Sequence, residues 1–157
     1  MNASSHDFKI IRQSVFRTLC SSCQKRVIEA ENGIVTSAFF VGRCFIEGIH
    51  RFPQNKKTGM DFLDLAVKLK SAEAMEYYGI VLFEGELVHK NEYKSIRILT
   101  EAVNTFNSCI ARVQLARIIL SHETFEIDSI SNRNVNYVLA KSYCKEAAKY
   151  GSTEGMV

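Results

Sequence analysis

The sequence has no tryptophan, a single proline and no long apolar run. One proline in 157 residues, beside ten phenylalanines and six tyrosines, favours helices packed around a core, because proline interrupts helices. No stretch approaches about 18 consecutive apolar residues, so we expect no insertion into a membrane. The first ten residues, MNASSHDFKI, lack the apolar segment of a signal peptide. These absences predict a cytoplasmic helical protein of a length that suits one domain.

Neither sign of charge dominates the sequence. Lys and Arg number 20 against 17 Asp and Glu, which gives a net charge of +3. A nucleic-acid-binding protein would carry a basic stripe or cluster, whereas here the bases are interleaved with acids. We therefore expect no nucleic-acid partner. Five cysteines, an odd number, predict free thiols in a reducing compartment.

Two of the cysteines form a C-x-x-C motif, Cys20-Ser21-Ser22-Cys23. A redox motif of this kind would open a helix after a strand, within a βαβ unit that the pattern does not predict. A zinc site would need two further ligands, and no second C-x-x-C or closely spaced histidine pair exists. On a helix the two thiols would share one face, so we interpret them as packed side chains, and likewise Cys44, Cys109 and Cys144.

Signatures of catalysis are missing from the sequence. It contains no P-loop, no nucleophile elbow, no H-E-x-x-H and no paired-carboxylate arrangement. Three histidines, His50, His89 and His122, fall near the ends of predicted helices, but no acidic partner recurs at a fixed offset from them. We predict that the chain is not an enzyme and uses no cofactor and no metal.

What the sequence does have is an internal repeat. Residues 37–48 read SAFFVGRCFIEG and residues 74–85 read AMEYYGIVLFEG, with Gly42 and Gly79 in the same slot. The same offset leads next to Ala116, in ARVQLARIILSH. Each copy predicts a helix, designated helix A. Gly79 is expected where helix A closely approaches its partner helix, and Gly85 is expected to end the helix in the left-handed conformation.

A second pattern lies between the copies of helix A. FLDLAVKLK (62–70), ILTEAVNTF (98–106) and YCKEAAKYG (143–151) carry apolar residues at helical spacing, and we designate them helix B. Residues 22–33 resemble a further helix B, which we expect to extend back to about Asp7. The loop at about 122–134 is longer and more polar than its counterparts, which predicts a surface insertion.

The order of these residues resembles the Sel-1-like repeat, a relative of the tetratricopeptide repeat. The residues that match are Gly42, Gly48, Gly79 and Gly85 in helix A, and Ala102, Ala147, Ala148 and Gly151 at the end of helix B. Ala116 replaces one glycine, and Phe62, Ile98 and Tyr143 stand where the family has a tryptophan. The resemblance implies an all-α fold: a right-handed α-solenoid of antiparallel helix pairs, with about three repeats and an N-terminal helix.

The same pattern gives an organisation for the chain. Residues 1–33 form an N-terminal B-type helix or cap, and residues 34–157 form the repeat array. The predicted units are 34–70, 71–107 and 108–151, followed by the start of a further unit at 152–157. The restart of the pattern at the end indicates a longer array or an unusual C-terminal end.

By analogy with the related tetratricopeptide groove, helix A also carries positions that the core does not use. They are Phe39, Arg43, Glu47, Glu76, Ile80, Phe83, Glu84, Val113, Arg117 and Leu120. This set is apolar for a solvated face, which suits a partner helix or an extended peptide. The alternative, that some of these residues pack against neighbouring repeats, is equally compatible with the sequence.

The function that we predict is a protein-interaction scaffold or adaptor, which binds a partner peptide or helix in the concave groove. Arg43 and Arg117 would engage carboxylates of the partner, and Phe39, Ile80 and Phe83 would anchor apolar side chains. The alternative is a structural subunit or fragment of a larger assembly, whose groove is buried by other chains.

Overall fold

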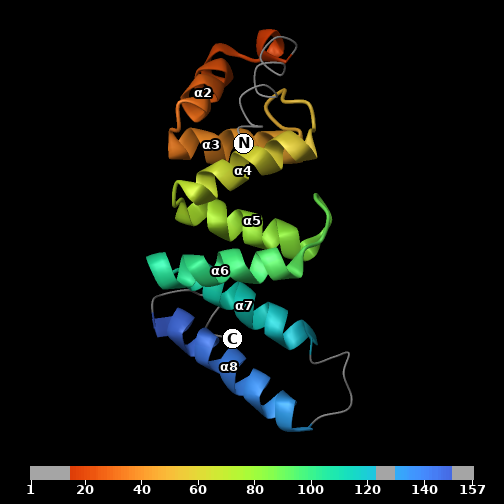
Figure 1. The fold of residues 1–157 in the computed structure, drawn as a ribbon, viewed down its shortest axis with the longest axis vertical. Coiled ribbons are helices and arrows are strands. Elements are labelled where there is room, and N and C mark those ends of the chain that lie inside the picture. The colour runs from red at the N-terminus through yellow and green to blue at the C-terminus, as the bar shows by residue number, and fades with distance from the viewer. Residues whose placement is uncertain (1–14, 123–129, 150–157) are drawn as a thin grey trace, which may run out of the picture. The chain divides into compact units, whose positions relative to one another are not determined.

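The computed structural model describes residues 15–122 and 130–149 (Figure 1). Every regular element in these residues is helical. The chain divides into two compact units, Met1–Ser71 and Ala72–Val157. A single domain was expected from the length alone. A repeat array can divide in this way because each repeat contacts only its neighbours.

In residues 15–71 the first unit contains a 3₁₀ turn and three α-helices: η1 (Phe16–Thr18), α2 (Ser21–Glu31), α3 (Val35–Glu47) and α4 (Lys56–Lys68). Helix α3 packs on both α2 and α4. Its buried Phe45 stacks on Phe62 of α4 at 6.2 Å between ring centroids and meets Phe52 edge-on at 4.9 Å. Helix A and helix B of the first repeat are therefore α3 and α4, joined by an aromatic core.

Helix α2 begins later than the sequence pattern predicts. Leu19 and Cys20 have extended backbone, with ψ of 148° and 158°, so no continuous helix runs back toward Asp7. The side-chain amide of Gln24 donates to the carbonyl oxygens of Phe16 and Leu19, at 2.9 and 3.1 Å. These bonds hold the extended link in place, although neither proline nor glycine marks it in the sequence. Asp7 itself lies outside the described residues.

The described residues of the second unit, 72–122 and 130–149, form four α-helices: α5 (Ala72–Glu84), α6 (Glu92–Phe106), α7 (Cys109–His122) and α8 (Ile130–Lys149). Helix α5 packs on α6 and on α7, and α7 packs on α6 and on α8. In the described parts of the chain no helix is long and apolar enough to cross a membrane. The expected insertion at 122–134 is shorter than predicted, because α8 already begins at Ile130. No proline or glycine interrupts residues 130–149, so residues 130–134, which we expected in the loop, form the first part of α8.

Glycines end the A helices of the first two repeats. Gly48 and Gly85 have φ of 70° and 72°, in the left-handed region that glycine adopts without a Cβ clash. The prediction for Gly85 is thereby confirmed. After each glycine the chain returns to the helix that it left: the backbone N–H of Asn55 donates to Phe45 O, and that of Asn91 to Leu82 O, both at 2.8 Å.

The same two asparagines start the B helices. The side-chain oxygen of Asn55 accepts from the N–H of Thr58 at 3.1 Å, and that of Asn91 accepts from the N–H of Lys94 at 2.9 Å. Each bond satisfies a backbone donor that has no partner within its helix. The two A-to-B connections therefore share one design, although their sequences IHRFPQNKK and ELVHKN differ in length and composition.

Gly79 lies where α5 closely approaches α6. A Cβ at this position would come within 2.6 Å of Leu99 Cγ, too close for a real contact. The carbonyl oxygen of Gly79 accepts a buried hydrogen bond of 2.6 Å from Ser95 Oγ. The predicted reason for a glycine inside this helix is confirmed: it lets the partner helix approach the backbone.

Candidate protein-interaction surfaces

Three of the predicted groove residues lie on α3 in the first unit. Arg43 is exposed, and Phe39 and Glu47 are half-buried. Arg43 Nε donates to Glu47 Oε1 at 2.8 Å, one helical turn away. Such exposed pairs contribute little to stability, so a carboxylate of a partner could compete with Glu47 for the guanidinium at small cost.

Four more predicted residues lie on α5 in the second unit. Ile80, Phe83 and Glu76 are half-buried, and Glu84 is exposed. The ring of Phe83 has Lys90 Nζ 5.0 Å from its centroid, within the range of a cation–π contact. Lys90 Nζ also lies 2.6 Å from Glu92 Oε1, so Phe83 presents an apolar ring edged by an ion pair.

Glu76 has a structural partner. Its Oε1 accepts from Ser108 Oγ at 2.6 Å, and Ser108 Oγ in turn accepts from the backbone N–H of Ala111 at 3.0 Å. Ser108 precedes α7, so this chain of bonds ties α5 to the first turn of α7. The carboxylate of Glu76 is thus occupied in joining two helices, a role that the sequence did not indicate.

The last three predicted residues lie on α7. Arg117 and Leu120 are exposed, and Arg117 Nη1 donates to Gln114 Oε1 at 2.8 Å. Val113 is only 7% exposed and contributes to the interior, so a partner would reach little of it. For Val113 the packing alternative applies.

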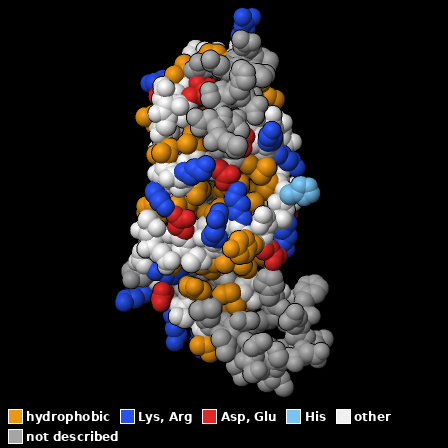
Figure 2. All heavy atoms as spheres, in the orientation of Figure 1, with side chains coloured by type: hydrophobic (Ala, Val, Ile, Leu, Met, Phe, Trp, Pro, Cys, Tyr) orange, Lys and Arg blue, Asp and Glu red, His pale blue; other side chains and the backbone are white. Residues whose placement is uncertain are grey.

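Part of the predicted set lies on two helices that pack on each other. Helices α5 and α7 contact each other, so Ile80, Phe83, Arg117 and Leu120 belong to one pair of adjacent helices, which we call the α5–α7 surface. Phe39, Arg43 and Glu47 belong to the other unit. A groove that runs through both units stays a prediction. On the face drawn in Figure 2, acidic, basic and apolar side chains are interspersed rather than gathered by kind.

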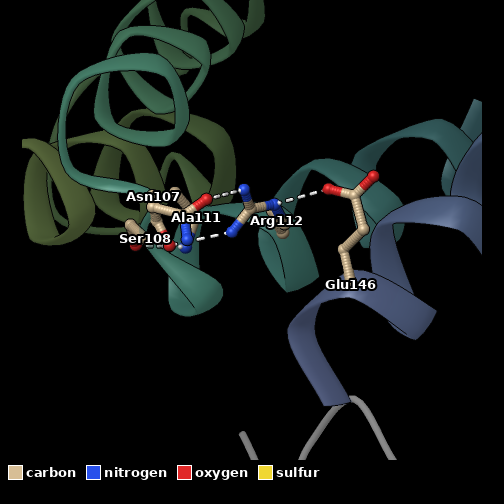
Figure 3. Close-up of polar contacts among 5 residues, drawn as sticks. All are labelled: Asn107, Ser108, Ala111, Arg112 and Glu146. Atoms are coloured by element: carbon tan, nitrogen blue, oxygen red, sulfur yellow. Dashed lines mark hydrogen bonds and ion pairs between the residues drawn. The ribbon is translucent and has the colours of Figure 1, made fainter. Parts of the chain in front are cut away.

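Sequence reasoning missed Arg112 of α7, which is 5% exposed. Its Nη1 donates to the carbonyl oxygen of Asn107 at 2.8 Å, and Nη2 donates to the Asn107 side-chain oxygen. On the other side, Nε lies 3.0 Å from Glu146 Oε2 of α8 (Figure 3). A buried guanidinium needs such partners, because burying a charge without them is costly. Arg112 therefore links the end of α6 to α8.

A signal for Arg112 was present in the sequence. In the aligned copies its slot holds Ala38 and Met75, both fully buried. A charged residue in a slot that other copies fill with buried apolar side chains indicates either a changed fold or an internal ion pair. In the structure Arg112 is buried and pairs with Glu146, whose own side chain is 52% exposed, so Arg112 is not available to a partner.

The comparisons agree with this architecture. No family model and no curated protein matches the chain. Among solved structures, it is similar to a Sel1 repeat protein from Oxalobacter formigenes, with 21% sequence identity and a TM-score of 0.65, over 87% of this chain and 96% of that one. It is also similar to a protective antigen of uropathogenic Escherichia coli strains that displays an SLR fold, with 17% identity and a TM-score of 0.64.

The second likeness covers 80% of this chain and 25% of that protein, so this chain spans about a quarter of its length. Together with the helix pairs, these likenesses define the class of protein: an all-α solenoid of helical repeats. Within that class, the fold is that of the Sel1 repeat proteins. Folds of this kind generally serve as scaffolds for protein interaction.

Proposed function

We propose that the protein is a non-enzymatic scaffold whose α5–α7 surface binds a partner helix or an extended peptide. The observation that supports the proposal is that α5, which carries Ile80 and Phe83, packs on α7, which carries Arg117 and Leu120. Helical-repeat proteins use such neighbouring helices to build an extended binding surface. Leu120 is 40% exposed, so it offers apolar area that a partner could cover.

The chemistry of the surface favours a partner with apolar anchors and acidic residues. Aromatic and arginine side chains are enriched where interfaces derive most of their binding energy. Phe83, with Lys90 at its ring, and Leu120 would receive the apolar side chains. Arg117 would pair with a carboxylate, exchanging its bond to Gln114 for a charge-assisted one.

The test uses peptides selected from a random library on the purified protein, with affinities measured by calorimetry. Leu120→Glu should weaken the selected peptides about tenfold or more, because it places a charge against their apolar anchors; tenfold corresponds to about 1.4 kcal/mol. The matched control is Ile96→Glu on α6, since Ile96 is 39% exposed and Leu120 is 40% exposed. Equal effects of the two variants, or no effect of either, would exclude the α5–α7 surface.

We further propose that Phe39, Arg43 and Glu47 of the first unit extend the same binding groove. Arg43→Glu and Arg117→Glu should then each weaken an acidic peptide, and the double variant should weaken it by about the product of the two factors. If Arg43→Glu leaves the affinity unchanged while Arg117→Glu lowers it, only the second unit binds. Circular dichroism of each variant checks that the helices remain folded.

One observation favours the second candidate function, a structural subunit of a larger assembly. Helix α6 exposes Tyr93 to 82% and Ile96 to 39%, although a B helix is not expected to line the groove. Another chain could cover these side chains. Sedimentation of the purified protein tests whether the chain assembles with copies of itself. An oligomer that Tyr93→Glu dissociates supports such an assembly, and a monomer at all concentrations opposes it.

A further inference from the structure

Cys20 and Cys23 occupy the N-terminal end of α2, an 11-residue helix. Cys20 is the N-cap: its backbone is extended, and its carbonyl oxygen accepts the first helical bond from Gln24 N at 2.9 Å. Its side chain is exposed, whereas Cys23 is 5% exposed in the first turn. The expectation that both thiols pack on one helix face holds for Cys23 alone, because the helix begins one residue after Cys20.

The pKa values of the two thiols differ as their exposure does: the exposed thiol has the lowered pKa, and the buried thiol has the raised one. Ser22 Oγ lies 3.2 Å from Cys20 Sγ. Its hydrogen bond, followed by those from the backbone and thiol of Cys23, lowers the pKa of Cys20 to about 7. Burial, followed by the neighbouring Cys20, raises the pKa of the Cys23 thiol, and a hydrogen bond with Ser22, followed by the charge of Arg26, partly opposes the rise. At neutral pH about half of the Cys20 side chains are therefore thiolates that can attack, while Cys23 stays a protonated thiol.

We propose that Cys20 and Cys23 form a thiol–disulfide exchange site, in which Cys20 attacks an accessible disulfide and Cys23 resolves the product. Exposure assigns the roles: an external disulfide can reach Cys20 Sγ, while Cys23 is within reach of the sulfur of Cys20. The substrate class is a small disulfide such as oxidised glutathione, or an exposed disulfide of a protein. The site is independent of the α5–α7 surface, since it lies in the other unit.

The proposed exchange balances in two steps. The Cys20 thiolate attacks one sulfur of the substrate, so that a new S–S bond forms, the substrate S–S bond breaks, and the first substrate sulfur leaves as a thiolate. Cys23 then loses its proton to solvent or to that thiolate and attacks Cys20 Sγ. The mixed disulfide breaks, and the second substrate sulfur leaves. Two electrons and two protons pass from the two cysteines to the substrate, which becomes two thiols.

The backbone permits the product disulfide. Side chains three residues apart in a helix have Cβ atoms about 5–6 Å apart, and a disulfide needs about 3.5–4.5 Å. Cys20 is outside the helical ladder on its N-terminal side, since Leu19 and Cys20 are extended. Its side chain can therefore approach Cys23 once the Gln24 bonds to Phe16 and Leu19 release the link before α2, without unwinding the helix.

Two other uses of these thiols fit the structure less well. Within residues 15–122 and 130–149, no group of three or more His, Cys, Asp or Glu could hold a metal ion, which opposes a zinc site. Cys44 of α3, in the same unit, is an alternative partner, since it interacts electrostatically with Cys23. It is buried, and desolvation raises its pKa to about 12, so it remains a thiol that external disulfides do not reach.

The experiment exposes the full chain to glutathione buffers of graded potential, traps free thiols by alkylation and reads intact and peptide masses. The expected result is a concerted loss of two thiols, mapped to a Cys20–Cys23 disulfide. Cys23→Ser should instead accumulate one glutathione adduct on Cys20, and Cys20→Ser should form neither adduct nor disulfide at Cys23. Cys144→Ser is the control and should retain the exchange.

Several outcomes would overturn the proposal. The native chain could stop at the glutathione adduct, or the Cys20–Cys23 pair could stay reduced at every potential. A Cys23→Ser variant that still forms an internal disulfide would show that Cys44, not Cys23, attacks the mixed disulfide. Circular dichroism and a second variant, Cys23→Ala, show whether folding is retained. If both Cys23 variants unfold, the native chain decides the question: a Cys20–Cys23 disulfide supports the proposal, and a lasting glutathione adduct overturns it.

The pH dependence gives an independent readout of the attacking sulfur. Alkylation of Cys20 in the native chain should rise with pH through a midpoint near 7, the pH at which its thiolate forms, whereas an ordinary thiol has its midpoint at about 8.5. At pH 7 the larger thiolate fraction, reduced by the weaker nucleophilicity of a more acidic thiol, predicts about threefold faster reaction. A midpoint above about 8 would remove Cys20 as the attacking group.

Discussion

The helix pairs of the first two repeats solve the same packing problem in different ways. In the α3–α4 pair, a glycine faces a glycine: a Cβ on Gly42 would lie 3.0 Å from Gly59 O, and a Cβ on Gly59 would lie 2.8 Å from Gly42 O. In the α5–α6 pair, Gly79 faces Ser95, whose hydroxyl bonds to the Gly79 carbonyl oxygen at 2.6 Å. One contact is backbone against backbone, and the other is backbone against a short polar side chain.

The third pair continues the series with alanines. Ala116 occupies the slot of Gly42 and Gly79, and Ala140 occupies that of Gly59 and Ser95, seven residues before the matching alanine of helix B. Both alanines are 2% exposed. In all three pairs, small residues therefore occupy this position on both helices, so that no large side chain holds the two backbones apart.

The largest expected effect comes from filling the slot in the second pair. Gly79→Leu must place a branched side chain where even a Cβ would lie 2.6 Å from Leu99 Cγ. We expect a loss of about 3 kcal/mol or more, or an unfolded second unit, because overpacking cannot be relieved between two helices. Thermal melting followed by circular dichroism measures it. Ile80→Leu, at the next position, is the control, and a Gly79→Leu melting temperature equal to that of the native chain would disprove the close approach.

A smaller but sharper effect separates the two glycines of the first pair. An alanine Cβ at Gly59 would meet Ile46 Cγ1 at 2.5 Å and two backbone atoms, Gly42 O and Ile46 N, at 2.8 and 3.0 Å. Backbone cannot move aside as a side-chain tip can, so Gly59→Ala should cost about 2–3 kcal/mol. At Gly42 the nearest atoms are 3.0 Å away.

The control for Gly59→Ala is therefore Gly42→Ala. Its milder clash is offset by about 1 kcal/mol of helix propensity, so the net change should stay within about 1 kcal/mol of zero. Urea unfolding of both variants measures the difference. Equal losses would show that the two helices are farther apart than the structure places them.

The hydroxyl of Ser95 tests the second pair directly. Ser95 is fully buried, and Ser95→Ala removes its hydrogen bond to Gly79 O. We expect a loss of about 0.5–1.5 kcal/mol, the net value of such a bond. Thr105→Ala, at an exposed position of the same helix, is the control for side-chain truncation. If Ser95→Ala and Thr105→Ala unfold at the same urea concentration, the buried hydrogen bond contributes nothing.

These contacts also show what the sequence could reveal. The spacing of Gly42 and Gly79 was enough to predict helix pairs and a close approach, because a glycine in an apolar helical stripe is costly unless something packs there. The start of α2 could not be predicted, since the break at Leu19 and Cys20 depends on bonds from Gln24 rather than on a breaker residue. The N-cap position of Cys20 was missed for the same reason.

The candidate surface was predictable only in part. Periodicity correctly placed Arg117 and Leu120 outside the core, but Val113 lies on the same helix and is buried. Exposure there depends on how α6 and α8 cover α7, which a single helix pattern does not contain. Glu76 illustrates a second limit: its bond to Ser108 joins residues of two helices, and no local rule pairs them.

The smallest expected effect concerns the exposed pair on α3, where charge rather than packing is altered. Arg43→Ala removes the 2.8 Å bond to Glu47, and the side chain of Arg43 is 50% exposed. Solvent and salt screen such a pair, so the loss should be about 0.2–0.5 kcal/mol at low salt and should shrink further in about 1 M salt, where the screening length is about 3 Å. Urea unfolding at both salt concentrations measures it. A loss above about 1 kcal/mol that salt does not reduce would mean that Arg43 stabilises the first unit by packing of its stem, and would argue against its use as an adaptable contact for a partner.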